Sequence, residues 1–256
     1  MNGGGARVIE SPQNARMKLW TALGETRGIR KHGAFLLAGR KTVPEALKRH
    51  GDQFSAVLAA KEADIAALKA PAALERFVLS RALFETLDIN GTGFPLLVGR
   101  VPEMPAADFS KAPKGLELVC ALGDPANLGA VLRSAAAFGA RRVVLMEAAA
   151  HPFHPKALRA AANAQFELQF LKGPGWPALN HGAGPMAALD GGGEDIGTFR
   201  WPPDIRLVLG EEGLGLPAGL NVRRLGIPTT GAVESLNATV AASLALQAHF
   251  EAMRKG

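Results

Sequence analysis

The feature that most constrains the fold is an alternation of short apolar runs with helical patterns through the second half of the chain. Apolar runs at Leu116–Leu122, Arg142–Met146 and Ile205–Leu209 predict buried strands. Helices are predicted at Asn127–Phe138 and Ser235–Met253. Weaker patterns predict strands at Phe166–Leu171, Gly184–Leu189 and Leu225–Pro228, and a helix at Pro155–Ala164. Strands that are apolar along their whole length are buried on both faces, so we expect an α/β fold whose mostly parallel sheet is covered by helices on both faces.

The amino-terminal part shows a similar but less regular alternation. Its predicted strands and helices fall at residues 12–24, 33–38, 43–50, 55–60, 63–70, 77–79, 81–87 and 96–99. The pattern is typical of a small α/β domain. Pro102–Pro113 contains three prolines and few apolar residues, which predicts a linker. We therefore expect an α/β domain at 1–101, a linker at 102–114 and a second domain at 115–256.

The charge of the chain is concentrated near its amino terminus. Residues 1–50 hold ten of the 29 basic residues and three of the 23 acidic ones, so they account for the net charge of +6. A basic module beside a nearly neutral one is typical of a protein that binds a polyanion, although a solvated helix face gives the same count. The candidate RNA-binding residues are Arg16, Lys18, Arg30, Lys31, Arg40 and Lys41.

Cysteine and histidine usage argues against metal and disulfide chemistry. Cys120 is the single cysteine, which excludes an intrachain disulfide and a multi-cysteine metal site, and its apolar run predicts a buried core residue. His151 and His154 each precede a proline and have no further ligand nearby, so we expect a structural turn and no metal. The sequence shows neither an apolar leader nor a membrane-spanning run, so a cytoplasmic protein without a membrane partner is expected.

Three segments that follow predicted strands carry the candidate chemistry. In Gly123–Gly139 a turn opens a helix near Asn127, which is a favoured helix cap. Arg133 follows six residues later, about 9 Å along a helix, so its guanidinium reaches the loop only by folding back. In Leu207–Pro217 a strand runs directly into glycines, which let a ligand approach the backbone closely.

The third segment, Ile227–Ser243, joins a predicted strand to the last predicted helix. An extended Ile-Pro leads into a loop, and Ser235 and Asn237 flank the start of the helix. Helix capping explains one of these two polar residues but hardly both.

Together the three segments resemble the SpoU/TrmH family of S-adenosylmethionine-dependent RNA 2′-O-ribose methyltransferases, in the SPOUT superfamily. The family pattern is Asn-x-Gly-x-x-x-Arg-x-x-x-x-Phe-Gly, then Leu-Gly-x-Glu-Gly-x-Gly-Leu, then Ile-Pro-x-x-Gly-x-x-x-Ser-Leu-Asn, and this sequence supplies each fixed position within 116–250. Pro152–Ala160 is similar to a further family segment. Ser11–Asn14 and Phe35–Arg40 look like the ribosomal-protein-like RNA-binding domain of many members, which commonly have Glu-Gly where this chain has Ala38-Gly39.

The resemblance implies a carboxyl-terminal trefoil knot, a cofactor held in it, and a homodimer that completes the site. It assigns catalytic roles to Arg133, Asn127, Glu212, Ser235 and Asn237. It assigns cofactor binding to Leu209, Gly210, Gly213, Ile227, Pro228, Ser235 and Leu236. Because a guanidinium stays protonated in proteins, we interpret Arg133 as a clamp for the nucleotide rather than as a base. Glu211 replaces the usual asparagine, and a carboxylate there would disfavour RNA phosphate unless it points to solvent.

The resemblance predicts 2′-O-methylation of ribosomal RNA, since the paired amino-terminal module commonly accompanies ribosomal targets. Three alternatives stay open at this point: a transfer-RNA ribose methyltransferase, a base-methylating SPOUT enzyme, and a non-catalytic RNA-binding protein of the same fold. Asn127 and Arg133 favour ribose chemistry over base chemistry. Their presence together with Glu212, Ser235 and Asn237 argues against a non-catalytic protein.

Overall fold

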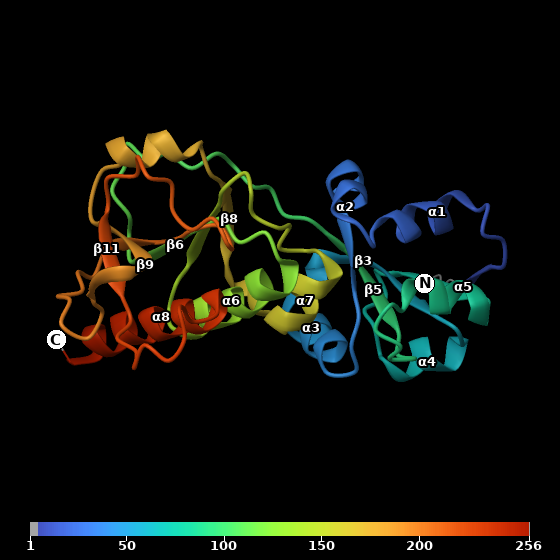
Figure 1. Cartoon of the computed structure of the whole chain (residues 1–256). Helices are drawn as coiled ribbons and strands as arrows, with labels where there is room; N and C mark the ends of the chain where they lie inside the picture. The colour runs from blue at the N-terminus through green and yellow to red at the C-terminus, as the bar shows by residue number, and fades with distance from the viewer. Residues whose placement is uncertain (1–4, 256) are drawn as a thin grey trace. The chain divides into compact units, whose positions relative to one another are not determined.

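The computed structural model of the chain describes residues 5–255, which divide into two compact units. Unit 1 contains residues up to Pro102 together with Phe153–Asn163, and unit 2 contains Glu103–Pro152 and the residues from Ala164 onward. Figure 1 shows the elements of both units in chain colours. Residues 153–163 therefore cluster with the amino-terminal residues, although the sequence pattern had placed them in the second domain.

Unit 1 is built on a five-stranded mixed sheet with the order β1-β4-β3-β5-β2. The strands are β1 (Arg7–Ile9), β2 (Ala34–Leu37), β3 (Phe54–Ala59), β4 (Glu75–Leu79) and β5 (Leu96–Arg100). β1, β4 and β3 are parallel neighbours, whereas β5 runs antiparallel to both β3 and β2. The α/β character expected of this part of the chain is confirmed, but β1 was not predicted.

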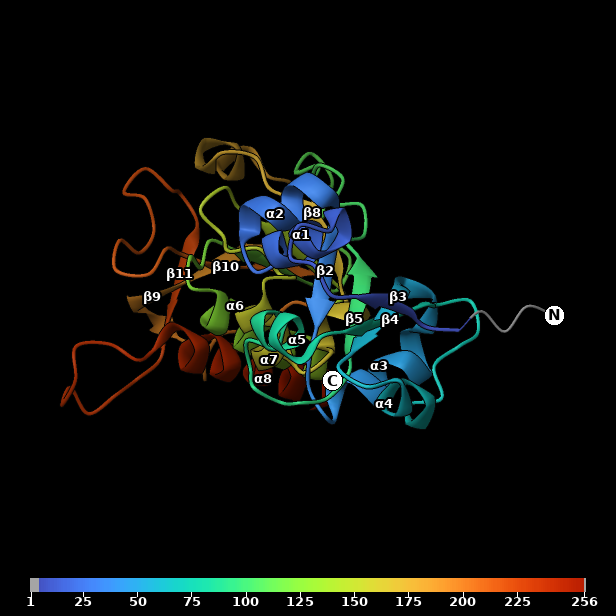
Figure 2. The same ribbon diagram turned by 90° about the vertical axis from the view of Figure 1, so that its right-hand side faces the viewer.

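Helices cover both faces of the unit 1 sheet. They are α1 (Ala15–Ala22), α2 (Thr26–His32), α3 (Thr42–His50), α4 (Glu62–Ala67), α5 (Arg81–Leu87) and α7 (Pro155–Ala161), with a 3-10 turn η1 (Gly51–Gln53). In the views of Figures 1 and 2, α1 lies on the side of the sheet opposite to α3 and α4. Trp20 of α1 packs edge-on against Phe77 of β4, with ring centroids 5.0 Å apart. The unpredicted α2 crosses α1 closely, because a Cβ at Gly28 would lie 1.8 Å from the Ala22 carbonyl oxygen.

The segment that contains α7 joins unit 1 through side-chain contacts. The ring of Phe153 lies 4.7 Å from that of Phe35 in β2. Asn163 Nδ2 donates to the Thr42 carbonyl oxygen at 2.9 Å. His154 Nδ1 accepts from the Lys156 amide at 3.2 Å and so caps α7. Helix capping is a structural role, as predicted for His154. The long-range contacts of Phe153 and Asn163 explain why residues 153–163 belong to unit 1 rather than to the second domain.

Unit 2 is built on a six-stranded sheet with the order β11-β9-β10-β6-β7-β8. The strands are β6 (Leu116–Cys120), β7 (Arg142–Leu145), β8 (Gln169–Lys172), β9 (Met186–Asp195), β10 (Ile205–Leu209) and β11 (Arg223–Gly226). Every pair of neighbours is parallel, which confirms the predicted parallel sheet. β9 is longer than predicted because, after its pairing with β10 ends, it continues along β11 with a register shift. The trefoil knot stays a prediction.

Both faces of this sheet are covered. Unit 2 contains α6 (Pro125–Ala137), α8 (Ala238–Lys255), η2 (Ala164–Glu167) and η3 (Trp176–His181). On one face Leu179 of η3 and the loop residue Phe109 pack against strand residues such as Val119 and Val208. On the other face α6 and α8 lie side by side (Figure 1), and the Ser134 and Ser243 hydroxyls are 2.7 Å apart between them.

The start of α6 corrects one detail of the sequence interpretation. The helix begins at Pro125, and its cap is Asp124, whose Oδ1 accepts from the Asn127 amide at 2.8 Å. Proline suits this first position because the missing amide hydrogen would have no partner inside the helix. Asn127 therefore lies within the first turn, and its side chain is available for another contact.

A buried ion cluster closes the amino-terminal end of the central strands. Glu117 at the start of β6 pairs with Arg206 of β10 at 2.6 Å and with Arg142 of β7 at 3.1 Å. The Arg206 guanidinium also donates to the carbonyl oxygens of Ala183 and Lys111 at 2.7 and 2.5 Å. Within residues 5–255, none of the helices has the length and hydropathy that a bilayer-spanning helix needs.

Candidate active site

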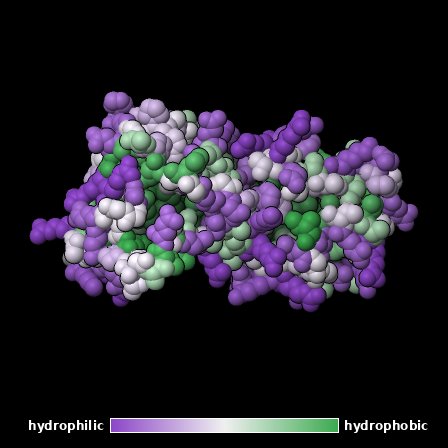
Figure 3. All heavy atoms as spheres, viewed as in Figure 1, coloured by the Kyte–Doolittle hydropathy of each residue, from purple (hydrophilic) through white to green (hydrophobic). Residues whose placement is uncertain are grey.

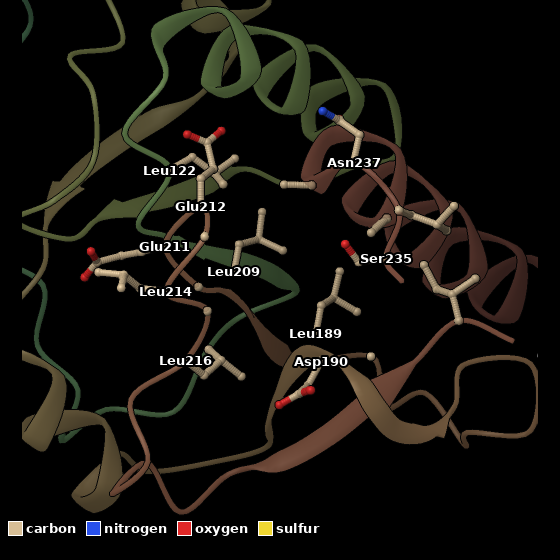
Figure 4. A pocket seen from close by; sticks show the side chains of 18 of the residues that line it. Leu122, Leu189, Asp190, Leu209, Glu211, Glu212, Leu214, Leu216, Ser235 and Asn237 are labelled. Atoms are coloured by element: carbon tan, nitrogen blue, oxygen red, sulfur yellow. The ribbon is translucent and has the colours of Figure 1, made fainter. Parts of the chain in front are cut away.

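A pocket of about 740 Å³ opens at the carboxyl ends of β6, β10 and β11 in unit 2. In parallel α/β sheets this is the end at which ligands collect, because strand ends and helix starts leave backbone groups exposed there. Figure 4 shows the pocket between the loop after β10 and the start of α8. Its walls consist of Leu122, Asn127, Leu189, Asp190, Gly191, Leu209, Gly210, Glu211, Glu212, Gly213, Leu214, Gly215, Leu216, Leu225, Ile227, Thr229, Glu234, Ser235, Leu236, Asn237, Ala238 and Ala241.

The loop after β10 forms one wall of the pocket largely with its backbone. The amide of Glu211 donates to the Gly215 carbonyl at 2.9 Å, and the Gly215 amide donates back to the Glu211 carbonyl at 2.8 Å. Gly213 and Gly215 have φ angles of +81° and +69°, in the region that favours glycine. A Cβ at Gly210 would lie 2.5 Å from the Gly215 carbonyl oxygen, so this tight turn requires glycine there as well.

Glu212 is fixed at the start of α6 by two hydrogen bonds. Its Oε1 accepts from Asn127 Nδ2 at 2.6 Å, and its Oε2 accepts from the Asp124 amide at 3.0 Å. The carboxylate thus satisfies a backbone amide just before the helix, where the helix dipole favours negative charge. The structure brings together two candidate catalytic residues that lie 85 positions apart in sequence.

Ser235 and Asn237 lie on the opposite wall, where the chain enters α8 (Figure 4). Asn237 Oδ1 accepts from the Thr239 amide at 2.9 Å and so caps the helix, while the Ser235 side chain is exposed at the pocket. We expected helix capping to explain only one of Ser235 and Asn237, and in the structure it explains Asn237. Ser235 remains available for a ligand.

The pocket contains most, but not all, of the site residues expected from the sequence. Arg133 lies on the exposed side of α6, outside the pocket lining, and forms no ion pair within residues 5–255. Pro228 is exposed and also lies outside the lining. Leu189, Asp190 and Gly191 of β9 line the pocket although the sequence interpretation passed over them. The sequence signal that could have identified them is their position at the end of the predicted strand Gly184–Leu189.

The side chain of Glu211, the departure from the family pattern, is directed away from Ser235 and Asn237 (Figure 4). Its Oε1 accepts from the indole Nε1 of Trp176 in η3 at 3.4 Å. The carboxylate is thus directed toward η3 rather than freely into solvent, and Glu211 is half-buried. Its effect on an RNA phosphate stays a prediction.

The basic candidates of unit 1 differ in how far they are already paired. Arg16 donates to both carboxylate oxygens of Glu75, at 2.7 and 3.1 Å. The Arg16 hydrogen bond is the main cause of a lowered pKa for Glu75. Arg40 donates to the Thr92 carbonyl at 3.0 and 2.9 Å. The remaining candidates are exposed and form no ion pair within residues 5–255: Lys18, Arg30, Lys31 and Lys41.

Residues 118–247, which contain the whole pocket lining, match the model of the SpoU rRNA Methylase family. The chain belongs to this family. It is 40% identical over 245 residues to Ribosomal RNA small subunit methyltransferase G 2 of Syntrophobacter fumaroxidans, covering 95% of this chain and 49% of that relative. The chain thus spans about half the length of that protein.

A second relative matches over nearly its full length. It is the 23S rRNA (guanosine(2553)-2'-O)-methyltransferase RlmP of Bacillus subtilis, 30% identical over 249 residues, which cover 93% of this chain and 97% of RlmP. Among solved structures, the SpoU methyltransferase AviRb of Streptomyces viridochromogenes in complex with AdoMet has a TM-score of 0.78 and 23% identity, covering 95% of this chain and all of AviRb. This likeness establishes that the SpoU chain shares the AviRb fold.

Proposed function

We propose that the chain transfers a methyl group from S-adenosylmethionine to a ribose 2′-hydroxyl of RNA, with ribosomal RNA as the substrate. The observation that carries this proposal is the glycine-walled pocket beside the Asn127–Glu212 pair, inside the part of the chain that matches the SpoU family. The names of both relatives, which are rRNA methyltransferases, support the substrate class.

The pocket fits S-adenosylmethionine in size and in chemistry. Its volume of about 740 Å³ lies in the range of small-molecule sites. Close backbone approach at Gly210 and Gly213 leaves amides and carbonyls for the adenine and ribose groups, and the apolar side chains of Leu209, Ile227 and Leu236 flank them. Pro228 would fix the backbone after Ile227. The bound cofactor supplies an electrophilic methyl on a positively charged sulfonium.

The carboxylates in the lining suit that positive charge. Glu212, Asp190 and Glu234 all face the same pocket, and Asp190 is held by an ion pair with Arg224. In a site partly shielded from water, fixed negative groups stabilise a cation more than they do in bulk solvent. Glu212 is the best placed to be rigid, because both of its oxygens are hydrogen-bonded.

In this proposal Arg133 positions the RNA rather than removing a proton. A guanidinium has five donors in a planar fork that matches a phosphate, and it stays charged. Ser235 and Asn237 shape the acceptor side of the pocket, where the ribose would enter. Most of the acceleration then comes from holding the hydroxyl in line with the methyl group and from stabilising the developing alkoxide.

We further propose a homodimer in which Arg133 of one copy serves the pocket of the other. Arg133 is absent from the pocket lining of its own chain, which supports this arrangement. Val233 in the loop before α8 is 57% exposed, and Val240 and Leu244 on the helix are 48% and 41% exposed. Figure 3 shows hydrophobic residues exposed over α8. An apolar helix face of this kind is typical of a surface that a partner covers.

Unit 1 would supply the electrostatic attraction for RNA. Lys18, Arg30, Lys31 and Lys41 have exposed ammonium and guanidinium groups that can displace counterions from phosphates. Arg16 and Arg40 belong to the same proposed surface, but their existing hydrogen bonds leave them fewer free donors. A ribosomal RNA substrate would place the reaction in the cytoplasm.

The test is incubation with methyl-labelled S-adenosylmethionine and separate ribosomal and transfer RNA fractions, followed by nuclease digestion to nucleosides. We expect label in a 2′-O-methyl nucleoside from ribosomal RNA. Label on a base would favour the base-methylating alternative, and label in transfer RNA would favour the transfer-RNA enzyme. Cofactor binding without methyl transfer to any RNA would favour the alternative of a non-catalytic RNA-binding protein. Asn127→Ala serves as the matched inactive control.

A further inference from the structure

The hydroxyl group of Thr239, in the first turn of α8, contacts Asn127 of the pocket although Thr239 does not itself line the pocket. Thr239 Oγ1 donates to Asn127 Oδ1 at 3.2 Å and lies 3.4 Å from the Asn127 carbonyl oxygen. Thr239 is half-buried and is not part of the pocket lining. We propose that Thr239 is a positioning residue that fixes the amide of Asn127, and through it Glu212, in the methyl-transfer site. The inference rests on the proposed function.

The two ends of the asparagine side-chain amide differ chemically. Its nitrogen only donates and its oxygen only accepts, whereas the ionised carboxylate of Glu212 only accepts. The 2.6 Å contact with Glu212 Oε1 therefore requires Asn127 to present its nitrogen there. This orientation turns Asn127 Oδ1 toward α8, where Thr239 supplies the matching donor.

Removal of the Thr239 hydroxyl would leave Asn127 Oδ1 without this donor in a half-buried place. The amide would then gain access to other rotamers, including the flipped one that presents its oxygen to the Glu212 carboxylate. That rotamer breaks the bond to Oε1 and leaves Glu212 held only by the Asp124 amide. The hydroxyl thus selects the one amide orientation that fixes both oxygens of Glu212.

Thr239 can act in this way because its backbone is held in the first turn of α8, where its amide donates to Asn237 Oδ1 at 2.9 Å. Ser243, one turn further along α8, makes a separate interhelical contact. Its hydroxyl donates to the Thr239 carbonyl at 2.7 Å and lies 2.7 Å from the Ser134 hydroxyl on α6, but it forms a hydrogen bond with neither Asn127 nor Glu212. Through Thr239, the segments that carry Asn127, Glu212 and Asn237 are joined in one hydrogen-bonded network.

The experiment compares Thr239→Val, which keeps the shape and removes the hydroxyl, with Thr239→Ser, which keeps the hydroxyl. For Thr239→Val we expect kcat for RNA methylation to fall by about tenfold, the equivalent of about 1.4 kcal/mol. The dissociation constant for S-adenosylmethionine should change by less than about twofold, since Glu212 stays in the pocket lining and keeps its bond to the Asp124 amide. Thr239→Ser should restore kcat. Ser243→Ala, which removes the neighbouring interhelical hydroxyl, is the matched control and should keep it.

A readout independent of activity is the side-chain amide signal of Asn127 in ¹⁵N-resolved NMR, assigned by its loss in Asn127→Ala. Thr239→Val should shift or broaden this signal, and Ser243→Ala should not. Thr239→Ala provides a second hydroxyl-free variant if the valine disturbs folding.

Unchanged kcat together with an unchanged amide signal in Thr239→Val would overturn the inference. So would an equal loss of kcat in Thr239→Ser or in Ser243→Ala, because that pattern reports helix packing alone. A wild-type protein that transfers no methyl group to RNA would instead defeat the proposed function. The amide signal still tests the positioning contact in that case.

Discussion

Replacement of Arg206 by methionine should destabilise unit 2 severely without touching the pocket. The side chains of Glu117 and Arg206 are 2% and 3% exposed, so the substitution leaves a carboxylate buried with less compensation. It also removes the donors for the carbonyl oxygens of Lys111 and Ala183 and the stacking of the guanidinium on Phe109. These contacts tie β10 to β6 and to loops at the end of the sheet remote from the proposed active site.

The expected magnitude follows from what remains around Glu117. Loss of one partner from a buried pair typically costs about 3–5 kcal/mol. Arg142 still lies 3.1 Å from Glu117, but its side chain is 34% exposed and therefore compensates the charge only in part. We therefore expect the lower end of the range, about 3 kcal/mol. With a urea m-value of about 2 kcal/mol/M, the unfolding midpoint of unit 2 should fall by about 1.5 M.

Cys120 provides a specific probe for this measurement. It is the single cysteine, fully buried in β6, and burial raises the pKa of its thiol to about 12. Because the thiolate is the reactive form, a brief pulse of maleimide should label Cys120 only in molecules whose unit 2 has opened. The labelled fraction across a urea gradient gives the midpoint for the wild type, for Arg206→Met, for Glu117→Gln and for the double variant.

The double variant decides whether the ion pair is the cause. Residues in direct contact should show a coupling free energy of about 1 kcal/mol or more, so the double variant should lose less stability than the sum of the single ones. A midpoint for Arg206→Met within about 0.3 M of wild type, or additive losses, would refute the reasoning. Stability of unit 2 would then come from its apolar core alone.

Three further predictions concern RNA and pH. Arg133→Ala should abolish methyl transfer while calorimetry shows unchanged cofactor affinity; retained turnover would remove Arg133 from the proposed role. The double substitution Arg30→Ala with Lys31→Ala should lower the slope of log affinity for RNA against log salt by about 0.7 per lost phosphate contact. Arg16→Ala, whose guanidinium is already paired with Glu75, should change that slope less in the same filter-binding assay, and equal effects would contradict this. Because the pKa of Glu75 is lowered by Arg16, its pair stabilises unit 1 above the unfolded value of 4.5 and is lost as the pH falls through the folded value. Acid unfolding of Glu75→Gln should therefore show a weaker dependence on pH in this range than the wild type, and identical curves would exclude the pair as a contributor.

The sequence predicted the elements whose signals are local and strong. Ile205–Leu209 and Arg81–Leu87 have the predicted bounds, because an apolar run or a helical repeat fills each of them. β1 and α2 were not predicted, and each has a physical explanation. Only Ile9 of β1 is buried, so the strand exists through its pairing with β4 rather than through a pattern of its own. α2 is short and contains Gly28, a poor helix former that the close crossing with α1 nevertheless requires.

Four of the candidate catalytic residues that the family pattern marks lie close together in the structure. Asn127, Glu212, Ser235 and Asn237 all line one pocket. That Asp190 joins them was signalled only by its place directly after the predicted strand Gly184–Leu189, because its position at the pocket depends on where β9 lies in the sheet. It also misassigned the cap of α6, because Asn127 and Asp124 are both good caps and the contact with Glu212 decides between them. The roles of all the candidate site residues, Arg133 and Pro228 included, stay predictions.

The backbone wall after β10 has a consequence for inhibitor resistance. A compound that competes for this pocket would direct many of its hydrogen bonds to main-chain amides and carbonyls, which no single mutation exchanges. Escape along this wall would require a side chain at Gly210, Gly213 or Gly215. At Gly210 the new Cβ would clash with the loop, and at the other two it would strain a left-handed backbone. Changes that exclude the compound there would therefore deform the same loop that the natural ligand needs.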